Sequence, residues 1–283
     1  MIDAHFHAWQ LSRGDYGWLT PELGVIYRDV QVSDWEQHAK AHGIEGGVLV
    51  QAAPTFEETL FLLNQAHQHA MVKGVVGWID MLAPDAIGKV AICAANPLLK
   101  GLRPMLQDIH DVDWILQTAI QPVLSAMAQH QLVLDALIKP VHLSNILKIA
   151  QAHPELKIVV DHGAKPKIEL NDMAHWRTSM ENLAQITSPN RVMCKMSGLW
   201  TEAPASSSVE MIQPWCKSLI DIWSPSRIIW GSDWPVLELA GTYTEWRKFT
   251  LKVLENYSAA DQALMLGQNA RKIYQLNNSF TNS

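Results

Sequence analysis

The chain has 283 residues, of which 48% are apolar and 18% charged, and a formal net charge of −6 with acidic and basic residues mixed along its length. This composition is typical of a globular protein with one large core and excludes a disordered chain. Without a surplus of basic residues, nucleic acid and anionic membranes are disfavoured as partners, and a small molecule is favoured.

No apolar run approaches the roughly 18 residues of a membrane span, and the first residues lack the basic and apolar regions of a signal peptide. We therefore expect a cytoplasmic protein without membrane contact. The three cysteines are widely separated and form no Cys-x-x-Cys pair, so neither disulfides nor a thiolate zinc site are predicted. A homo-oligomer is compatible with the sequence.

Eight short apolar runs recur along the chain and predict strands. They begin at Ile2, Ile44, Val72, Leu99, Leu132, Lys157, Arg191 and Arg227. Between most of them lie stretches of helical periodicity, such as DWEQHAKAHG and LSNILKIAQAHP. Parallel neighbours need such crossovers, so the sheet is expected to be parallel. Eight units in this length favour an α/β fold with a single (β/α)8 TIM barrel over residues 1–283, with an open doubly wound sheet as the alternative.

Histidines gather at the predicted strand ends. His5 and His7 share one side of the first strand because side chains alternate faces. His162 ends the sixth strand, and Asp233 ends the eighth. Catalytic groups of a TIM barrel lie at the C-terminal strand ends, so these four residues are predicted to meet at one mouth. A His-x-His pair by itself is equally compatible with two buried rings.

Five segments in chain order resemble the amidohydrolase superfamily: DAHFHAW, KGLRPMLQD, DHGAKP, CKMSGL and WGSDWPV. The resemblance runs from about Ile2 to about Trp246. It is to the branch that holds sugar lactonases, such as L-fuconolactonase and L-rhamnonolactonase, and 2-pyrone-4,6-dicarboxylate lactonase. It implies an amidohydrolase-like barrel in which the catalytic residues, which polarise a lactone carbonyl and activate water, are His5, His7, His162 and Asp233.

The resemblance also implies substrate-binding residues. Arg103 in GLRPM matches a family position that holds the substrate, and His142 in KPVHL resembles a PxHL segment of the sugar lactonases. Lys195 in CKMSG is expected to face the mouth or to lie next to it. Trp200 stands just past the seventh strand, where its ring could stack on a sugar-like ring or simply fill the core. Lys139 stands where metal-dependent members carry a ligand histidine, which argues against a two-metal site.

Opening a lactone needs an activated water, a polarised carbonyl oxygen and a proton for the leaving alkoxide. We expect Asp233 to take the proton from water and to deliver it to the leaving oxygen. The oxyanion would be surrounded by His5, His7 and His162. Two versions stay open: imidazole N–H donors without a cofactor, or one divalent ion, zinc or manganese, bound by these three histidines and Asp233.

Other enzyme classes are disfavoured by missing motifs. The chain has no Gly-x-Ser-x-Gly elbow and no phosphate-binding glycine loop, so a serine hydrolase and a nucleotide cofactor are not expected. The expected function is hydrolysis of a lactone, with a sugar aldonolactone or sugar acid as the small-molecule partner. A metal-dependent decarboxylase, another amidohydrolase of the same fold and an inactive sugar-acid-binding barrel are the alternatives. The loop after the first strand is long enough to form a lid, and its Trp18 could contact the substrate.

Overall fold

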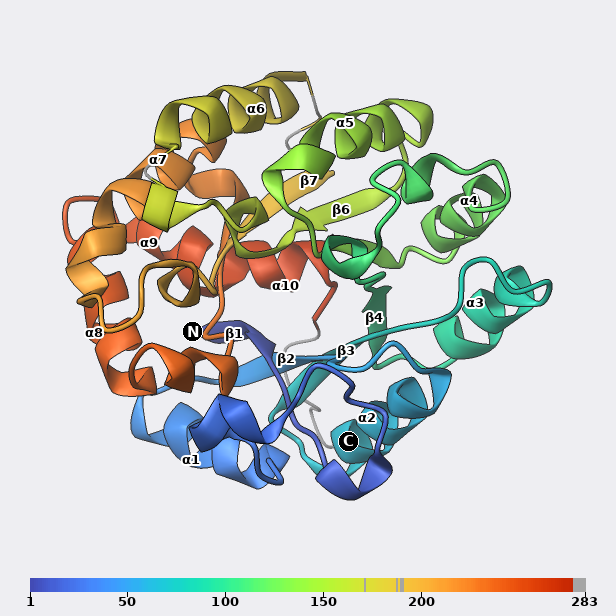
Figure 1. Cartoon of the computed structure of the whole chain (residues 1–283), viewed down its shortest axis with the longest axis horizontal. Helices are drawn as coiled ribbons and strands as arrows, with labels where there is room; N and C mark the ends of the chain where they lie inside the picture. Colours follow the sequence, from blue (N-terminus) through green and yellow to red (C-terminus); the bar gives the residue numbers. More distant parts are fainter. Residues whose placement is uncertain (171, 187, 189–190, 277–283) are drawn as a thin grey trace.

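A computed structural model describes residues 1–170, 172–186, 188 and 191–276, so the predicted domain boundary at residue 283 lies outside the described residues. Eight parallel strands pair in chain order (Figure 1). They are β1 (Ile2–Phe6), β2 (Gly46–Val50), β3 (Val72–Gly77), β4 (Leu99–Leu102), β5 (Val133–Ala136), β6 (Lys157–Val160), β7 (Val192–Met196) and β8 (Ile228–Trp230). A parallel bridge between Phe6 of β1 and Trp234, in the segment just after β8, closes the ring. The predicted (β/α)8 barrel is confirmed, and the open sheet is wrong.

Helices surround the strands on the outside of the barrel (Figure 1). They are α1 (Val32–Ala41), α2 (Phe56–Gln68), α3 (Ala86–Ala94), α4 (Gln121–Gln129), α5 (Leu143–Ala152), α6 (Met173–Ile186), α7 (Gln213–Trp223) and α8 (Tyr243–Leu254). The chain continues into α9 (Ala259–Ala263) and α10 (Asn269–Ile273), and α10 lies across the middle of the barrel in Figure 1. Local signals set several starts, since the hydroxyls of Thr55 and Thr242 accept the N–H of the residue three positions on. Within the described part of the chain, no helix is long and apolar enough to cross a membrane.

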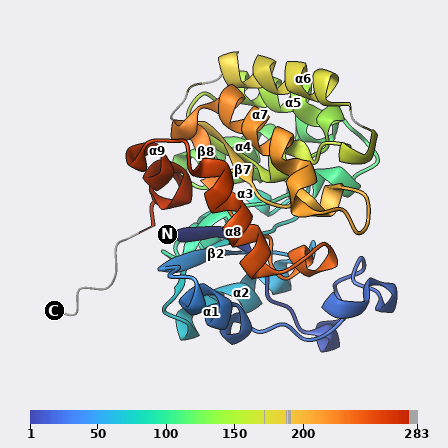
Figure 2. The same cartoon turned by 90° about the vertical axis from the view of Figure 1, so that its left-hand side faces the viewer.

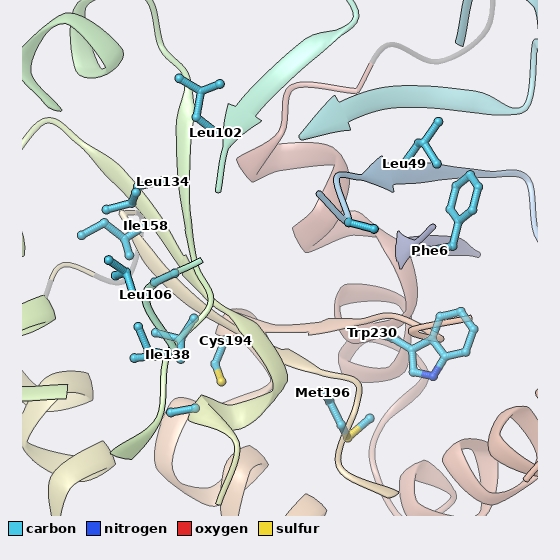
Figure 3. Packing of buried hydrophobic residues seen from close by; sticks show 14 of the residues in the cluster. Phe6, Leu49, Leu102, Leu106, Leu134, Ile138, Ile158, Cys194, Met196 and Trp230 are labelled. Carbon is cyan, nitrogen blue, oxygen red and sulfur yellow. The ribbon is translucent and has the colours of Figure 1, made fainter. Parts of the chain in front are cut away.

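The hydrophobic core has two parts because alternate residues of each strand face opposite sides. The outward side chains, several of which are labelled in Figure 3, pack between the strands and the helices. The inward side chains form a second cluster with Ile273 of α10 and with Tyr274, which directly follows that helix. The helix α10 therefore closes the barrel at the N-terminal ends of the strands. In Figure 2, the N-terminus and α9 lie at this end, and the blue loop after β1 lies at the other.

The pairing of β1 with β2 is irregular. Asp3 pairs with Gly47, and Phe6 pairs with Leu49, so three steps along β1 face two steps along β2. The extra residue is a β-bulge, a feature that turns side chains to the opposite face of a strand.

The bulge decides which way the histidine pair points. Ile2 and Ala4 belong to the inward cluster, whereas Phe6 faces outward and stacks on Trp35 with the ring centroids 3.8 Å apart. Strict alternation from Ala4 would send His5 outward and Phe6 inward. Because of the bulge, His5 faces the barrel interior, where its ring contacts Lys195.

Candidate active site

A cavity of about 340 Å³ opens at the C-terminal ends of the strands. Its walls include His7, Arg103, His162 and Asp233. The volume is of the size that holds a small molecule. A larger pocket, of about 650 Å³, lies at the opposite end of β5, β6 and β7 and contains none of the predicted site residues.

Three imidazoles converge on one carboxylate oxygen at the base of this cavity. The distances to Asp233 Oδ1 are 3.5 Å from His5 Nε2, 3.4 Å from His7 Nε2 and 3.8 Å from His162 Nε2. All four side chains are buried. The structure thus brings together the four residues that the sequence assigned to catalysis.

Unusual backbone geometry places two of these side chains. His162 has φ 52° and Asp233 has φ 59°, both in the left-handed region that non-glycine residues rarely adopt. Gly198, with φ 60°, passes directly behind them: a Cβ there would stand 2.4 Å from His162 Nδ1 and 3.0 Å from Asp233 Oδ2. Glycine is needed at this position for both its conformation and its small size.

The second ring nitrogen of each histidine has a defined partner. His7 Nδ1 lies 2.7 Å from the carbonyl oxygen of Val50, which can only accept, so this nitrogen donates. His162 Nδ1 lies 2.9 Å from the hydroxyl of Ser197. His5 Nδ1 lies 3.1 Å from Lys195 Nζ.

Burial sets the protonation of the site. It lowers the pKa of His162 to about 4 and that of His5 well below its ordinary value, so both rings are neutral near pH 7. Burial alone would raise the pKa of Asp233, but the interactions with His162, His7 and His5 outweigh it and hold that pKa below its ordinary value. An ionised carboxylate therefore faces neutral imidazoles.

A layer of charged side chains lies beneath the histidines. Lys195 Nζ is 2.6 Å from Asp135 Oδ2 and 3.0 Å from Asp161 Oδ1, and the Tyr274 hydroxyl donates to Asp135 from below. All four side chains are almost fully buried. Sequence reasoning missed Asp135 and Asp161. Each aspartate lies inside an apolar run, LVLDALIK or KIVVDHGA, and a buried carboxylate needs a charged or hydrogen-bonding partner. The two runs could therefore have indicated a buried ion pair.

Arg103 links the cavity wall to this layer. Its Nη2 donates to the backbone oxygen of Gln51, and its Nη1 lies 3.4 Å from Asp161 Oδ2. Its Nε has no hydrogen-bond partner among the described residues. This wall residue therefore combines a fixed positive charge with an unused donor, which suits the predicted substrate contact.

The structure does not place the other predicted binding residues on the described cavity wall. Lys195 lies one layer below it, in the buried charged cluster. His142 is buried after β5, where its Nδ1 contacts the backbone of Lys139. Trp200 donates its indole N–H to the backbone oxygen of Ser207 and fills space between loops.

Three more polar side chains line the cavity, of which Lys165 and Glu202 were missed by sequence reasoning and Trp18 was expected from the loop after the first strand. Lys165 and Glu202 form an ion pair of 2.9 Å, and both line the cavity. Trp18, from the loop after β1, lines it as well and donates its indole N–H to the backbone oxygen of Ala52. The lid predicted for this loop therefore has at least one side chain over the cavity.

The donor set fits a divalent ion. One ligand atom each from His5, His7 and Asp233 lie within 4.8 Å of one another, as do atoms of His5, Asp161 and His162. The gaps of 3.4 and 3.5 Å to Asp233 exceed an ordinary hydrogen bond. They match the separation of about 3.4 Å between ligands around a tetrahedral zinc with bonds of about 2.1 Å.

A family model described as amidohydrolase matches residues 2–276. The chain belongs to the amidohydrolase family. L-fucono-1,5-lactonase of Burkholderia ambifaria is 40% identical over 279 residues, which cover 97% of this chain and 95% of that protein. L-fucono-1,5-lactonase of Burkholderia multivorans is 31% identical and covers 97% of this chain and 96% of that protein.

A solved structure from the same family has nearly the same fold. It is an amidohydrolase from Burkholderia multivorans with bound zinc, and it superimposes with a TM-score of 0.91 at 30% identity, covering 98% of this chain and 99% of that one. The family membership predicted from the five sequence segments is confirmed, and the chain is an enzyme of this family.

Proposed function

We propose that this amidohydrolase opens a sugar aldonolactone by attack of water on the ring ester carbonyl. The observation that carries the proposal is the Asp233 carboxylate held among three imidazoles at the base of a small-molecule cavity. The lactonases at 40% and 31% identity, matched over nearly their full length, support the same reaction. The alternatives of a decarboxylase and an inactive binding protein are not favoured.

Asp233 is the proton carrier of the reaction. Its ionised carboxylate takes a proton from water while the water oxygen bonds to the carbonyl carbon. The tetrahedral intermediate then collapses by breaking the bond to the ring oxygen, and Asp233 returns the proton to that oxygen. The product is a hydroxy acid, and the carboxylate is restored.

The developing oxyanion needs donors that are already in place. The neutral imidazoles of His5 and His162 can each present one N–H to the cavity, and Arg103 adds a guanidinium on the wall. Oriented donors of this kind are worth about 3 kcal/mol each in the transition state.

A divalent ion, zinc or manganese, is proposed as the cofactor that His5, His7 and Asp233 could hold. When bound, it would supply Lewis-acid polarisation of the carbonyl oxygen. The role of Asp233 as proton carrier and of Arg103 in holding the substrate rests on the side chains themselves.

The charges of the wall favour a neutral sugar lactone over a dicarboxylate. The cavity is lined by two basic residues, Arg103 and Lys165, and by three acidic ones, Asp108, Glu202 and Asp233. Lys165 is already paired with Glu202 at 2.9 Å. A doubly negative substrate would meet one available cation, whereas the hydroxyls of a sugar can use both charged and polar groups of this wall.

The test is acid release from L-fucono-1,5-lactone and a panel of other aldonolactones, followed with a pH indicator, with and without a chelator. We expect turnover by the wild type and a loss of about 10²–10⁴ in kcat for Asp233→Asn, the range of a general acid-base group. The matched control is Asp85→Asn, an exposed aspartate that pairs with Lys89 on α3. It should keep the wild-type rate.

The outcomes separate the candidates. If no lactone releases acid, or if Asp233→Asn turns over as fast as Asp85→Asn, the proposal is wrong. Release of carbon dioxide from an aromatic acid would favour the decarboxylase. Turnover that survives the chelator assigns the chemistry to the side chains, and turnover that is lost and then restored by zinc assigns the ion.

A further inference from the structure

Lys195 is an unusual residue in this barrel because a lysine with no solvent exposure sits directly beneath the histidines. Its Nζ donates to Asp135 Oδ2 at 2.6 Å, faces Asp161 Oδ1 at 3.0 Å and lies 3.1 Å from His5 Nδ1. The two carboxylates are its ion-pair partners. An ammonium has three donors and no acceptor, so its contact with an imidazole nitrogen has only one possible direction.

That direction fixes the proton of His5. A neutral imidazole has one donor and one acceptor nitrogen, and Nδ1 must be the acceptor if it receives the ammonium N–H. We propose that Lys195 holds His5 in the tautomer with the proton on Nε2. His5 then presents an N–H to the cavity, and its Nε2 could bind an ion only after that proton moves to Nδ1.

Competing contacts at Nδ1 are too long to reverse this assignment. The alternative acceptor for a proton on Nδ1 is Asp161 Oδ1, at 3.7 Å, beyond hydrogen-bond range. The contact with Lys195 is 0.6 Å shorter and lies within that range.

The surroundings of His5 Nε2 do not decide which ring nitrogen carries the proton. Arg103 Nη1, a donor, lies at 3.5 Å, and Asp233 Oδ1, an acceptor, lies at the same distance. Both distances are longer than ordinary hydrogen bonds. The tautomer is therefore set at the other ring nitrogen, where the close partner is.

His7, two residues further along and just past the end of β1, has the opposite arrangement. Its Nδ1 faces the carbonyl oxygen of Val50 at 2.7 Å, so Nδ1 carries the proton and Nε2 offers a lone pair. The His-x-His pair thus consists of one donor and one acceptor toward the cavity. In the lactone hydrolysis proposed above, on which this role rests, His5 donates to the oxyanion, and Lys195 acts as the positioning residue.

The tautomer can be read without turnover. Long-range ¹H–¹⁵N spectra of the ¹⁵N-labelled protein distinguish protonated from unprotonated ring nitrogens, and the His5 signals are assigned by their loss in His5→Gln. We expect a neutral His5 with the proton on Nε2 and a His7 with the proton on Nδ1. A proton on Nδ1 of His5 in the wild type would overturn the proposal.

Zinc affinity gives a second readout. Lys195→Met alone leaves the buried carboxylate of Asp135 without a counter-charge, whereas Asp161 keeps Arg103. The informative variant is therefore Lys195→Met with Asp135→Asn, which removes one charge of each sign. Its matched control is Asp135→Asn alone, which keeps the contact between Lys195 and His5. Without the ammonium, Asp161 is the nearby acceptor for a proton on Nδ1 of His5, the arrangement that supports a ligand histidine.

We expect the double variant to bind zinc at least about 10-fold more tightly than Asp135→Asn, because a partner of a ligand histidine typically changes metal affinity by 10–100-fold. The dissociation constants are measured by competition with a chromophoric chelator at constant pH. Equal affinities would contradict the proposal. If the double variant does not fold, the wild-type spectra decide. Neither measurement needs a substrate, so a protein that opens no lactone refutes the proposed function and leaves this inference to its own tests.

Discussion

Gly198→Ala tests whether the crowded backbone behind the site controls its geometry. The new Cβ would stand 2.4 Å from Nδ1 and 2.7 Å from Cγ of His162. The ring cannot swing away freely, because its Nδ1 is bonded to the hydroxyl of Ser197 at 2.9 Å and the residue itself is held at φ 52°. The substitution therefore has to displace either the ring or the strand end.

The magnitude follows from these distances. The ring has to retreat by about 1 Å to reach an ordinary contact of 3.4 Å. Such a misplacement of a catalytic group costs about 100-fold in rate, or about 2.7 kcal/mol of transition-state stabilisation. Alanine at φ 60° also strains the folded backbone and lowers the free energy of unfolding by about 1–2 kcal/mol.

Gly43→Ala is the control that separates the two effects. Gly43 also has a positive φ, 67°, but nothing lies within 4 Å of the position of a Cβ. Both variants should lose about 1–2 kcal/mol in urea unfolding from the conformational penalty alone. A loss of kcat/KM on the lactone is expected for Gly198→Ala and not for Gly43→Ala.

One result would refute this reasoning. If Gly198→Ala keeps the wild-type kcat/KM while its stability falls like that of Gly43→Ala, the position of the His162 ring is not what the glycine protects.

Three further substitutions test the packing and the charges. Phe6→Ala removes the buried ring that stacks on Trp35 and should lower the free energy of unfolding by about 3–4 kcal/mol in urea; a loss below about 1 kcal/mol would contradict this. The Asp3 carboxylate accepts the N–H groups of Ser232 and Trp35, and in Asp3→Asn the amide must turn its NH₂ toward one of these donors. The substitution should lower the free energy of unfolding by about 1–3 kcal/mol in the same assay. Unchanged stability would contradict this expectation. Burial raises the pKa of Glu58 to about 7, above its ordinary 4.5, so the wild type should lose up to about 3 kcal/mol of stability as the pH rises from 4.5 to 7. Glu58→Gln should lack this part of the pH dependence, and parallel curves for the two proteins would disprove the assignment.

Some of the active site could be predicted because it depends on chain order alone. The C-terminal ends of parallel strands share one edge, so His7 after β1, His162 after β6 and Asp233 after β8 had to approach each other once the barrel formed. The resemblance to a known family pointed to the same residues. Neither argument required side-chain coordinates.

Other parts depended on depth inside the barrel, which a linear pattern does not give. Lys195 was expected at or beside the mouth, yet inward positions two residues apart on a strand lie in successive layers, and this one lies below the histidines, between Asp135 and Asp161. Trp200 and His142 stand at strand ends as predicted, but local bonds to backbone groups turn them away from the described cavity wall.

The order of eight strands and helices, and the gathering of three imidazoles and a carboxylate at one end, follow from the sequence, because hydrophobic periodicity sets the elements and parallel strands align their ends. The orientation of His5 does not follow, since Asp3 has the same parity on β1 and yet bonds Trp35 on the outside of the barrel. Only the bulge between Asp3 and Phe6 turns the histidine inward. The partner of His5 Nδ1 is Lys195, which comes from β7. A contact between strands so far apart in the chain exists only after the barrel closes.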